Sequence, residues 1–170
     1  MSAQASNEAL AELHIPVAST ADVCDANPDA RVLLAPWRRF GGTERCAGHV
    51  EIVSTQNDNS LVKKILKERG NGRVLLIDAE GSINCAMLGG NLAELAAKKG
   101  WAGIIVNGAV RDTNELKESP IAVYALASCP RRSVNRGLGS RNRSVRVGGE
   151  KVCAGDFLVA DADGVVVIAS

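Results

Sequence analysis

The stretch RVLLIDAEGSINCAMLGGNLAELAAKKGWAGIIVNGAVRD, residues 73–112, contains the pattern that decides the fold. Residues 73–78 and 103–106 are short apolar runs. Between them, residues 88–99 have the spacing of an amphipathic helix that ends at Gly100. Short apolar runs that alternate with helical segments are typical of parallel strands covered by helices. The stretch therefore predicts a strand–helix–strand unit of an α/β domain.

Further elements are expected on both sides of this unit, because turn residues separate the remaining patterned segments. Helices are predicted at residues 19–26, with Ser19 or Thr20 as the cap, from Asn59 or Ser60 to 68, and at 112–118. Strands are predicted at residues 49–54, 121–127, 145–152 with a break at Gly148-Gly149, 157–160 and 165–169. The predicted architecture is one α/β domain at residues 19–170, with a partly parallel sheet, flanking helices and additional C-terminal strands. Residues 1–18 are interpreted as an N-terminal extension.

Composition excludes several classes of protein. The chain has 170 residues, of which 46% are hydrophobic, so it can bury one sizeable core. Its formal net charge of +1 provides no general attraction to DNA or to anionic membranes. No apolar run approaches the roughly 18 residues of a membrane helix, and the N-terminus lacks a signal-peptide core. Five widely spaced cysteines without a CxxC motif indicate reduced thiols. We expect a cytoplasmic protein that binds neither membrane nor DNA.

The pair Gly89-Gly90 precedes the central predicted helix and continues into Asn91 and Leu92. A helix N-terminus presents unpaired backbone N–H groups that can bind an anion, and glycine lets a ligand approach the backbone closely. A tight turn without a ligand is the alternative interpretation. No nucleotide-binding glycine motif is present in the required context. The pair therefore predicts an anion site only in combination with other residues.

Those other residues follow the next predicted strand. Twenty residues separate Gly90 from Arg111, Asp112 comes next, and Glu115 lies three positions further on. Arginine can bind a carboxylate through two parallel hydrogen bonds, and two carboxylates one turn apart can hold Mg²⁺ or Mn²⁺. The alternatives are a surface ion pair and a capping box formed by Asp112 and Glu115. The combination predicts a site for a small carboxylic acid that chelates a metal.

Other chemistry is disfavoured by the residues that are scarce. His14 and His49 are the only histidines and neither has metal-ligand neighbours, which argues against a histidine zinc site and a Ser-His-Asp triad. No lysine lies inside an apolar strand, where a Schiff-base lysine would be activated. The arginine-rich segment 131–146 is interpreted as a solvated loop or a subunit contact. Its alternative is a binding site for an acidic partner or RNA, although no aromatic residues are interleaved with the arginines.

Several segments together resemble the RraA-like family, which includes the regulator of ribonuclease activity A and the 4-hydroxy-4-methyl-2-oxoglutarate aldolases. The segments are residues 20–25, 71–75, 88–93, 100–112 and 161–165. The resemblance covers the chain from Ser19 to the C-terminus. It implies a ββα swivelling-type domain that assembles as a homotrimeric ring with sites between subunits.

The resemblance also implies an activity and the residues that perform it. The activity is divalent-metal-dependent cleavage of 4-hydroxy-4-methyl-2-oxoglutarate to two pyruvates, with oxaloacetate decarboxylation through the same metal-stabilised pyruvate enolate. By position, the backbone N–H groups of residues 89–92 would bind substrate. Arg111 would bind substrate and act in catalysis, and Asp112 would hold the metal, partly through water.

One position departs from the best-known aldolases of the family, which carry an aspartate where this chain has Gly90. Glu115 resembles the compensating carboxylate of a recognised variant and is predicted as a second metal ligand beside Asp112. The regulator branch lacks the aspartate after the arginine, so Asp112 favours an enzyme. The alternative function is a non-catalytic regulator that binds and inhibits an RNA-processing ribonuclease or helicase. Methyl transfer to a quinone lacks a recognisable adenosylmethionine-binding motif.

Overall fold

Strand β4 (Val74–Asp78) is buried along its whole length, as its unbroken apolar run predicts. It pairs in parallel with β3 (Cys46–Ser54) on one side and with β6 (Gly103–Val110) on the other. Strand β7 (Ala122–Ser128) extends this parallel arrangement beyond β6. The strand–helix–strand unit and the partly parallel sheet expected from the sequence are therefore confirmed.

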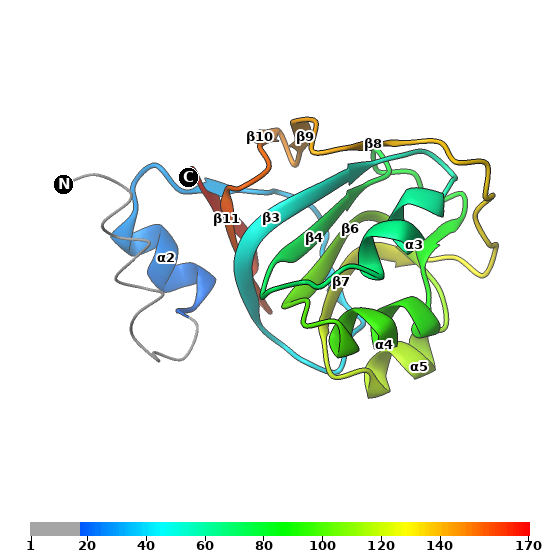
Figure 1. Cartoon of the computed structure of the whole chain (residues 1–170). Coiled ribbons are helices and arrows are strands. Elements are labelled where there is room, and N and C mark those ends of the chain that lie inside the picture. The colour runs from blue at the N-terminus through cyan, green and yellow to red at the C-terminus, as the bar shows by residue number, and fades with distance from the viewer. Residues whose placement is uncertain (1–17) are drawn as a thin grey trace.

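The computed structural model describes residues 18–170, and in it β3 joins two halves of one curled sheet (Figure 1). The last five residues of β3 pair with β4, whereas residues 46–49 pair antiparallel with β11 (Phe157–Asp161). Strand β11 pairs with β12 (Gly164–Ile168), which in turn pairs with the short β1 (Arg31–Val32). The C-terminal strands thus form an antiparallel continuation of the parallel half, rather than a fully separate sheet.

Short strands complete the architecture. Strand β5 (Ala86–Leu88) adds in parallel to the end of β6, and β8 (Ser140–Arg141) adds to β3. Strand β2 (Arg38–Arg39) pairs with β7 at the opposite edge. Strands β9 (Val145–Val147) and β10 (Glu150–Val152) form a separate hairpin that turns at Gly148-Gly149, as the sequence predicts.

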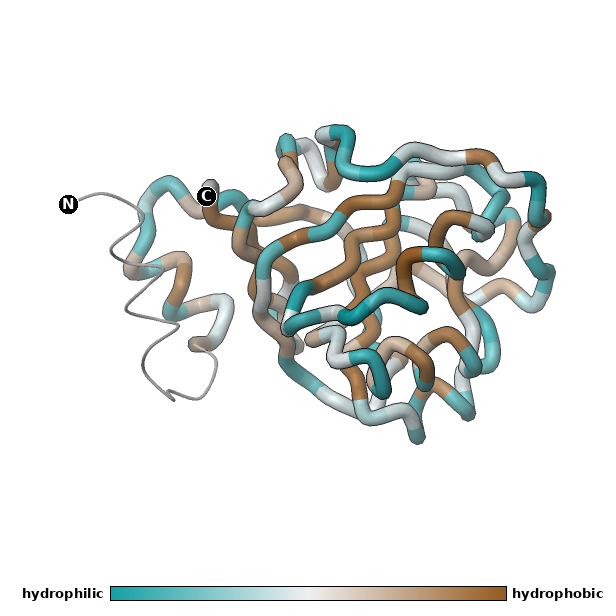
Figure 2. The backbone as a smooth tube through the Cα atoms, in the orientation of Figure 1, coloured by the Kyte–Doolittle hydropathy of each residue, from teal (hydrophilic) through white to brown (hydrophobic). Residues whose placement is uncertain are grey.

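Three helices pack on one face of the parallel half: α3 (Ser60–Leu66), α4 (Gly90–Lys98) and α5 (Thr113–Glu118) (Figure 1). Alternate residues of β4 belong to different cores, because successive side chains point to opposite faces of a sheet. Leu75 and Ile77 pack in the core beneath the helices, and Val74 and Leu76 pack in the core enclosed by the antiparallel half. Apolar residues accordingly run along the strands in Figure 2.

Helix α2 (Thr20–Ala26) lies beside β11 and β12, apart from the other helices (Figure 1). The hydroxyl of Ser19 accepts a hydrogen bond from the Asp22 N–H, which confirms Ser19 as the cap. The hydroxyl and backbone N–H of Thr20 both donate to the buried Asp161 carboxylate, at 2.7 and 2.8 Å. These bonds attach the start of the described chain to its C-terminal strands.

Several predicted boundaries are wrong. The strand predicted from His49 begins at Cys46, where it pairs with β11, and the helix predicted to end at residue 68 ends at Leu66. Two further errors lie at the central turn. The helix predicted from Leu88 begins at Gly90, because Leu88 is the last residue of β5. The strand predicted to end at Val106 continues to Val110, since β5 supplies a partner for its second half. Pairing between distant segments extends a strand beyond the apolar run that marks it in the sequence.

The predicted extension at residues 1–18 lies outside the described residues except for Ala18. Over residues 18–170, no helix has the length and apolar character needed to cross a bilayer.

Candidate functional site

The turn between β5 and α4 lies directly beside the turn between β6 and α5. Leu88 is in register with Val110, and the Arg111 N–H donates to the Leu88 carbonyl at 3.0 Å. Because two parallel strands end side by side, Gly89-Gly90 and Arg111-Asp112 meet at the same edge of the sheet. This edge, at the carboxyl ends of the strands, is where ligands of α/β proteins commonly bind.

Asp112 has an unusual backbone conformation, with φ of +59° and ψ of +45°. Few residues other than glycine adopt this left-handed region, although asparagine and aspartate tolerate it best. The Asp112 carboxylate accepts a hydrogen bond from the Gly90 N–H at 3.2 Å and makes no capping bond to α5. The capping-box alternative for Asp112 and Glu115 is therefore wrong, because the carboxylate faces the neighbouring turn instead.

Both glycines leave room for the carboxylate side chains that lie against them. A Cβ atom at position 89 would lie 2.6 Å from Asp112 Oδ2. A Cβ atom at position 90 would lie 2.7 Å from the Glu115 Cβ and would also contact Glu115 Oε2. Real Cβ contacts are longer than this, so side chains at these positions would displace the two carboxylates. The Glu115 side chain thus occupies the space that a side chain at position 90 would fill.

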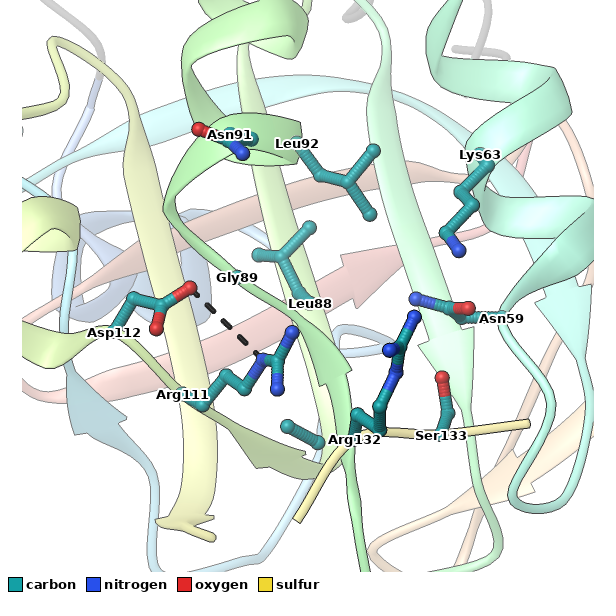
Figure 3. A pocket seen from close by; sticks show the side chains of 11 residues that line it. Asn59, Lys63, Leu88, Gly89, Asn91, Leu92, Arg111, Asp112, Arg132 and Ser133 are labelled. Carbon is teal, nitrogen blue, oxygen red and sulfur yellow. Dashed lines mark ion pairs between the residues drawn. The ribbon is translucent and has the colours of Figure 1, made fainter. Parts of the chain in front are cut away.

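A cavity of about 250 Å³ opens in front of this turn (Figure 3). Five of the predicted site residues line it: Gly89, Asn91, Leu92, Arg111 and Asp112. Gly90 and Glu115 adjoin the turn but do not line the cavity. Pockets for drug-sized ligands are about 300–1,000 Å³, so this volume suits a smaller ligand, the size of a simple organic acid.

The opposite side of the cavity is formed by residues that the sequence did not reveal as site residues. They are Asn59, Lys63, Arg132 and Ser133, and Ala86 and Leu88 complete the lining. Figure 3 shows Asp112 and Arg111 on one side, Asn59, Lys63 and Arg132 on the other, and Leu88 and Leu92 between them. Arg132 belongs to the arginine-rich segment already noted. No local motif marks Lys63 or Asn59, which lie about 50 residues before Arg111 and Asp112.

Backbone hydrogen bonds fix the segment that carries Arg132. On one side, the Ala86 N–H donates to the Arg131 carbonyl at 2.8 Å. On the other side, the Val134 N–H donates to the Asn57 carbonyl at 2.7 Å, and the Asn59 N–H donates to the Val134 carbonyl at 3.3 Å. The segment therefore bridges β5 and the loop before α3, which places Arg132 and Ser133 over the cavity.

Asp58 anchors the continuation of this segment from a fully buried position. Its carboxylate accepts hydrogen bonds from the Ser60 N–H and hydroxyl and from the N–H groups of Arg136 and Leu138. Asp58 therefore supplies side-chain hydrogen bonds at the start of α3. The predicted cap, Asn59, makes no capping hydrogen bond with its side chain. Burial alone would raise the pKa of Asp58, but these hydrogen bonds outweigh it and lower the pKa to about 2.

Replacing Asp58 with alanine is expected to lower the free energy of unfolding by about 2–4 kcal/mol, because buried donors lose their acceptor. Because its folded pKa lies below the ordinary value of 3.8, ionised Asp58 stabilises the fold above about pH 4. That contribution is lost as the pH falls toward about 2. Urea titrations of wild type and Asp58→Asn should differ at about pH 6 and converge near pH 2. A difference that does not change with pH would contradict this role.

Two carboxylates at the turn have the chemistry to hold a hard divalent cation. Asp112 and Glu115 supply two exposed carboxylates, and Mg²⁺ typically binds proteins through one or two carboxylates while keeping several waters. Residues 18–170 contain no cluster of three or more His, Cys, Asp or Glu side chains suited to a metal. An all-protein metal cage is therefore absent from the described part of the chain. A cation here would complete its coordination with water and ligand oxygens.

The arginine-rich segment is not one uniform basic surface. Arg141 forms ion pairs with the carboxylates of Glu51 and Glu68. Arg131 donates to the Asn84 carbonyl at 3.4 Å, and Arg146 donates to the Gly149 carbonyl at 2.7 Å. Arg132 lines the cavity. These arginines therefore have separate roles within the fold.

All five cysteines are free thiols, as expected.

Comparison with known proteins gives a consistent family. The RraA-like family (Aldolase/RraA) matches residues 20–167. A Burkholderia mallei protein named "Putative 4-hydroxy-4-methyl-2-oxoglutarate aldolase" is 48% identical over 155 residues, covering 88% of this chain and 94% of that protein. A Burkholderia pseudomallei protein of the same name has the same identity and coverage.

Two solved structures share the fold closely. One is described as the RNA-processing inhibitor RraA from Thermus thermophilis, with 45% identity, a TM-score of 0.87 and coverage of 90% of this chain and 93% of that one. The other is described as an S-adenosylmethionine:2-dimethylmenaquinone methyltransferase from Geobacillus kaustophilus, with 38% identity, a TM-score of 0.88 and coverage of 90% and 96%. The relatives' names differ in function, but the family model and these identities agree on descent. The chain belongs to the RraA-like family.

Proposed function

We propose that this protein is a divalent-metal-dependent carbon–carbon lyase. It cleaves 4-hydroxy-4-methyl-2-oxoglutarate to two pyruvates and decarboxylates oxaloacetate. The relatives named as aldolases, at 48% identity over most of the chain, support a lyase. The reaction, its metal dependence and the residue roles are our proposal, and they rest on the geometry of the turn.

The observation that carries the proposal is the grouping of two carboxylates, one arginine and a glycine turn at one edge of the sheet. Asp112 and Glu115 lie against Gly89 and Gly90, and Arg111 lines the same cavity as Asp112. Arg111 Nε lies 4.0 Å from Asp112 Oδ2, with both side chains about 40% exposed, so each has room for a further partner. A 2-oxo acid has a carboxylate for the backbone N–H groups, and a carbonyl oxygen for Arg111 and a cation.

Each group of the chain then has a defined task. The N–H groups of Asn91 and Leu92 bind the carboxylate next to the carbonyl, which helps to fix the orientation of the substrate, whereas the Gly90 N–H donates to Asp112. Arg111 stabilises the negative charge that moves onto the carbonyl oxygen as the carbon–carbon bond breaks. Leu88 and Leu92 provide an apolar wall beside the breaking bond. Asp112 and Glu115 are the predicted holders of the cation.

When bound, a divalent cation supplies Lewis-acid polarisation of the 2-oxo group, which favours the same shift of charge. Both proposed reactions require this shift, because each leaves an electron pair on the carbon next to the carbonyl. One site can therefore serve both substrates.

The proposal is tested by measuring pyruvate release from each substrate with Mg²⁺, with Mn²⁺ and with EDTA. We expect release from both substrates with metal and none above background with EDTA. A control with metal and no protein is required, because oxaloacetate loses CO₂ slowly by itself. If neither substrate yields pyruvate above that control, the lyase proposal is wrong.

A swap of positions 90 and 115 tests the second carboxylate. Glu115→Gly is expected to weaken Mg²⁺ activation by about 10–100-fold, the size of effect usual for groups that support a metal site. Gly90→Asp alone should also impair activity, because its side chain would meet Glu115. The double variant Gly90→Asp/Glu115→Gly should recover part of the lost Mg²⁺ affinity, since glycine at position 115 removes the Cβ that would lie 2.7 Å from a Cβ at position 90 and leaves that space to the new carboxylate.

The measurement is the Mg²⁺ concentration that gives the half-maximal rate in wild type, in each of the two single variants and in the double variant. Glu115→Gln is the matched control, because it keeps the size of the side chain without its charge. Full Mg²⁺ activation of Glu115→Gln would remove Glu115 from the proposed cation site.

A second candidate function is regulation of RNA processing. It is favoured by the structure described as the RNA-processing inhibitor RraA, which is 45% identical to this chain. Exposed side chains of segment 131–146, such as Arg136 and Arg143, are the surface that would contact an acidic partner. The test is capture of an RNA-processing ribonuclease or helicase by wild type and by Arg136→Glu/Arg143→Glu. Equal capture by both proteins would count against this surface.

We also propose the homotrimer that the resemblance implies, with its sites between subunits. Light scattering should then give about three times the chain mass of 17.8 kDa. A monomer mass would contradict it. The cytoplasmic location remains a prediction from the sequence.

A further inference from the structure

We infer that Lys63, Arg132 and Asn59 form a second carboxylate subsite, which makes the cavity selective for 2-oxo acids that carry a carboxylate at the far end. The inference rests on the proposed function, in which Arg111 and Asp112 bind the 2-oxo acid end. It assigns a role to the other side of the cavity and names the residues that determine the substrate class.

The side of the cavity opposite Asp112 is positively charged. Lys63 and Arg132 line one side of the cavity, and neither forms a salt bridge in the part of the chain that the structure describes. Arg73 and Arg141, by contrast, both pair with Glu51. With Arg111, the lining holds three cations against the single carboxylate of Asp112. This excess of positive charge favours a ligand with more than one negative group.

Asn59 also indicates a polar ligand. The residue is buried, with 9% of its surface exposed, and its Oδ1 has no hydrogen-bond partner among residues 18–170. Buried amide atoms are almost always hydrogen-bonded, so an unpartnered one beside a cavity indicates a polar ligand or bound water. The two ends of the amide are interchangeable by rotation, so Asn59 can donate to a carboxylate or accept from a hydroxyl.

The geometry joins these residues into one subsite. The Arg132 side chain points toward the Asn59 amide, and the Lys63 amine points into the same space (Figure 3). Their backbones are linked, because the segment of Arg132 is hydrogen-bonded to the loop that carries Asn59, and Lys63 follows one turn along α3. Leu88 and Leu92 separate this group from Arg111 and Asp112 (Figure 3). A short carbon chain along these leucines would place one carboxylate at each end.

The two proposed reactions should use the subsite differently. In cleavage of 4-hydroxy-4-methyl-2-oxoglutarate, the bond between C3 and C4 breaks and its electron pair stays on the C3 side. C4 becomes the carbonyl of the second pyruvate as its hydroxyl gives a proton to water, and C3 takes up a proton from water, so the far carboxylate keeps its charge. In oxaloacetate the far carboxylate itself leaves as neutral CO₂. Cations that hold that carboxylate stabilise the reactant more than the transition state, so they should not accelerate decarboxylation.

The test uses two uncleavable ligands of equal length, 2-oxoglutarate and 2-oxopentanoate, which differ in the far carboxylate. Their dissociation constants are measured by calorimetry with Mg²⁺ for wild type, Lys63→Met and Arg132→Gln. We expect wild type to bind 2-oxoglutarate about tenfold or more tightly, because a hydrogen bond to a charged group has about this effect. Each substitution should remove most of the preference and leave 2-oxopentanoate binding unchanged, which also shows that the variants fold.

Lys64→Met and Arg136→Gln are the matched controls, because both residues are exposed neighbours that do not line the cavity. Both should keep the wild-type preference. Equal affinity of wild type for the two acids, or a preference that survives both cavity substitutions, overturns the inference. If the preference is present and lost as expected while no substrate is cleaved, the subsite stands and the lyase proposal falls.

Turnover provides a second readout in an active protein. Lys63→Met and Arg132→Gln should raise KM for 4-hydroxy-4-methyl-2-oxoglutarate by about tenfold, and they should not lower kcat for oxaloacetate. If kcat and kcat/KM for oxaloacetate fell by the same factor, these residues would act in the chemical step. That result would contradict a binding subsite.

Discussion

Asp112→Asn is expected to reduce metal-dependent pyruvate release by about 10³-fold or more, because it removes the charged ligand that both proposed reactions require. Asparagine is the sharpest replacement at this position. It has the same shape, tolerates the left-handed backbone conformation and retains an oxygen that can accept from the Gly90 N–H. A loss of activity in Asp112→Asn would therefore result from the missing charge and not from misfolding.

Asp112→Ala is expected to lose activity as completely, with an added destabilisation of about 1 kcal/mol because alanine is disfavoured at positive φ. Calorimetric titration with Mg²⁺ provides a readout independent of turnover, and Asp112→Asn should bind the cation much more weakly than wild type. Full activity in either variant would remove Asp112 from the metal site.

Arg111→Ala is expected to lower kcat/KM by about 10³-fold, because charge then develops on the substrate oxygen without its guanidinium partner. Much of this effect should appear in kcat, since the interaction strengthens as the carbon–carbon bond breaks. Arg111→Lys is the matched variant. It keeps the charge but lacks the planar fork, so an intermediate loss is expected.

Steady-state kinetics on both substrates distinguishes the roles of Arg111. An increase in KM with unchanged kcat would restrict this residue to substrate binding. Equal activity of Arg111→Lys and wild type would show that charge alone is sufficient and that paired hydrogen bonds are not needed.

The sequence predicted the central part of the fold because that part is encoded locally. The apolar run at residues 73–78 and the helix before Gly100 each carry their own periodicity. The curl of the sheet is harder to predict from the sequence. It depends on β3 pairing with β4 at one end and with β11 at the other, more than 100 residues away along the chain. No local pattern specifies a partner at that distance.

The residues of the candidate site also divide into those that the sequence predicts and those that only the fold reveals. The positions from Gly89 to Glu115 could be chosen from spacing, because two adjacent parallel strands bring their ends together. The wrong alternative was the capping box, since a sequence does not show that Asp112 adopts positive φ and faces Gly90. Asn59, Lys63 and Arg132 were missed because the fold, and no motif, carries them to the cavity.

In the proposed mechanism, metal-dependent cleavage requires the Asp112 carboxylate. This requirement is tested by comparing initial rates of pyruvate release from 4-hydroxy-4-methyl-2-oxoglutarate by wild type and Asp112→Asn, with saturating Mg²⁺ and with EDTA. We expect release only by wild type with Mg²⁺, at a rate about 10³-fold or more above the variant. Equal rates in the two proteins, or release by wild type that EDTA does not reduce, would contradict this requirement.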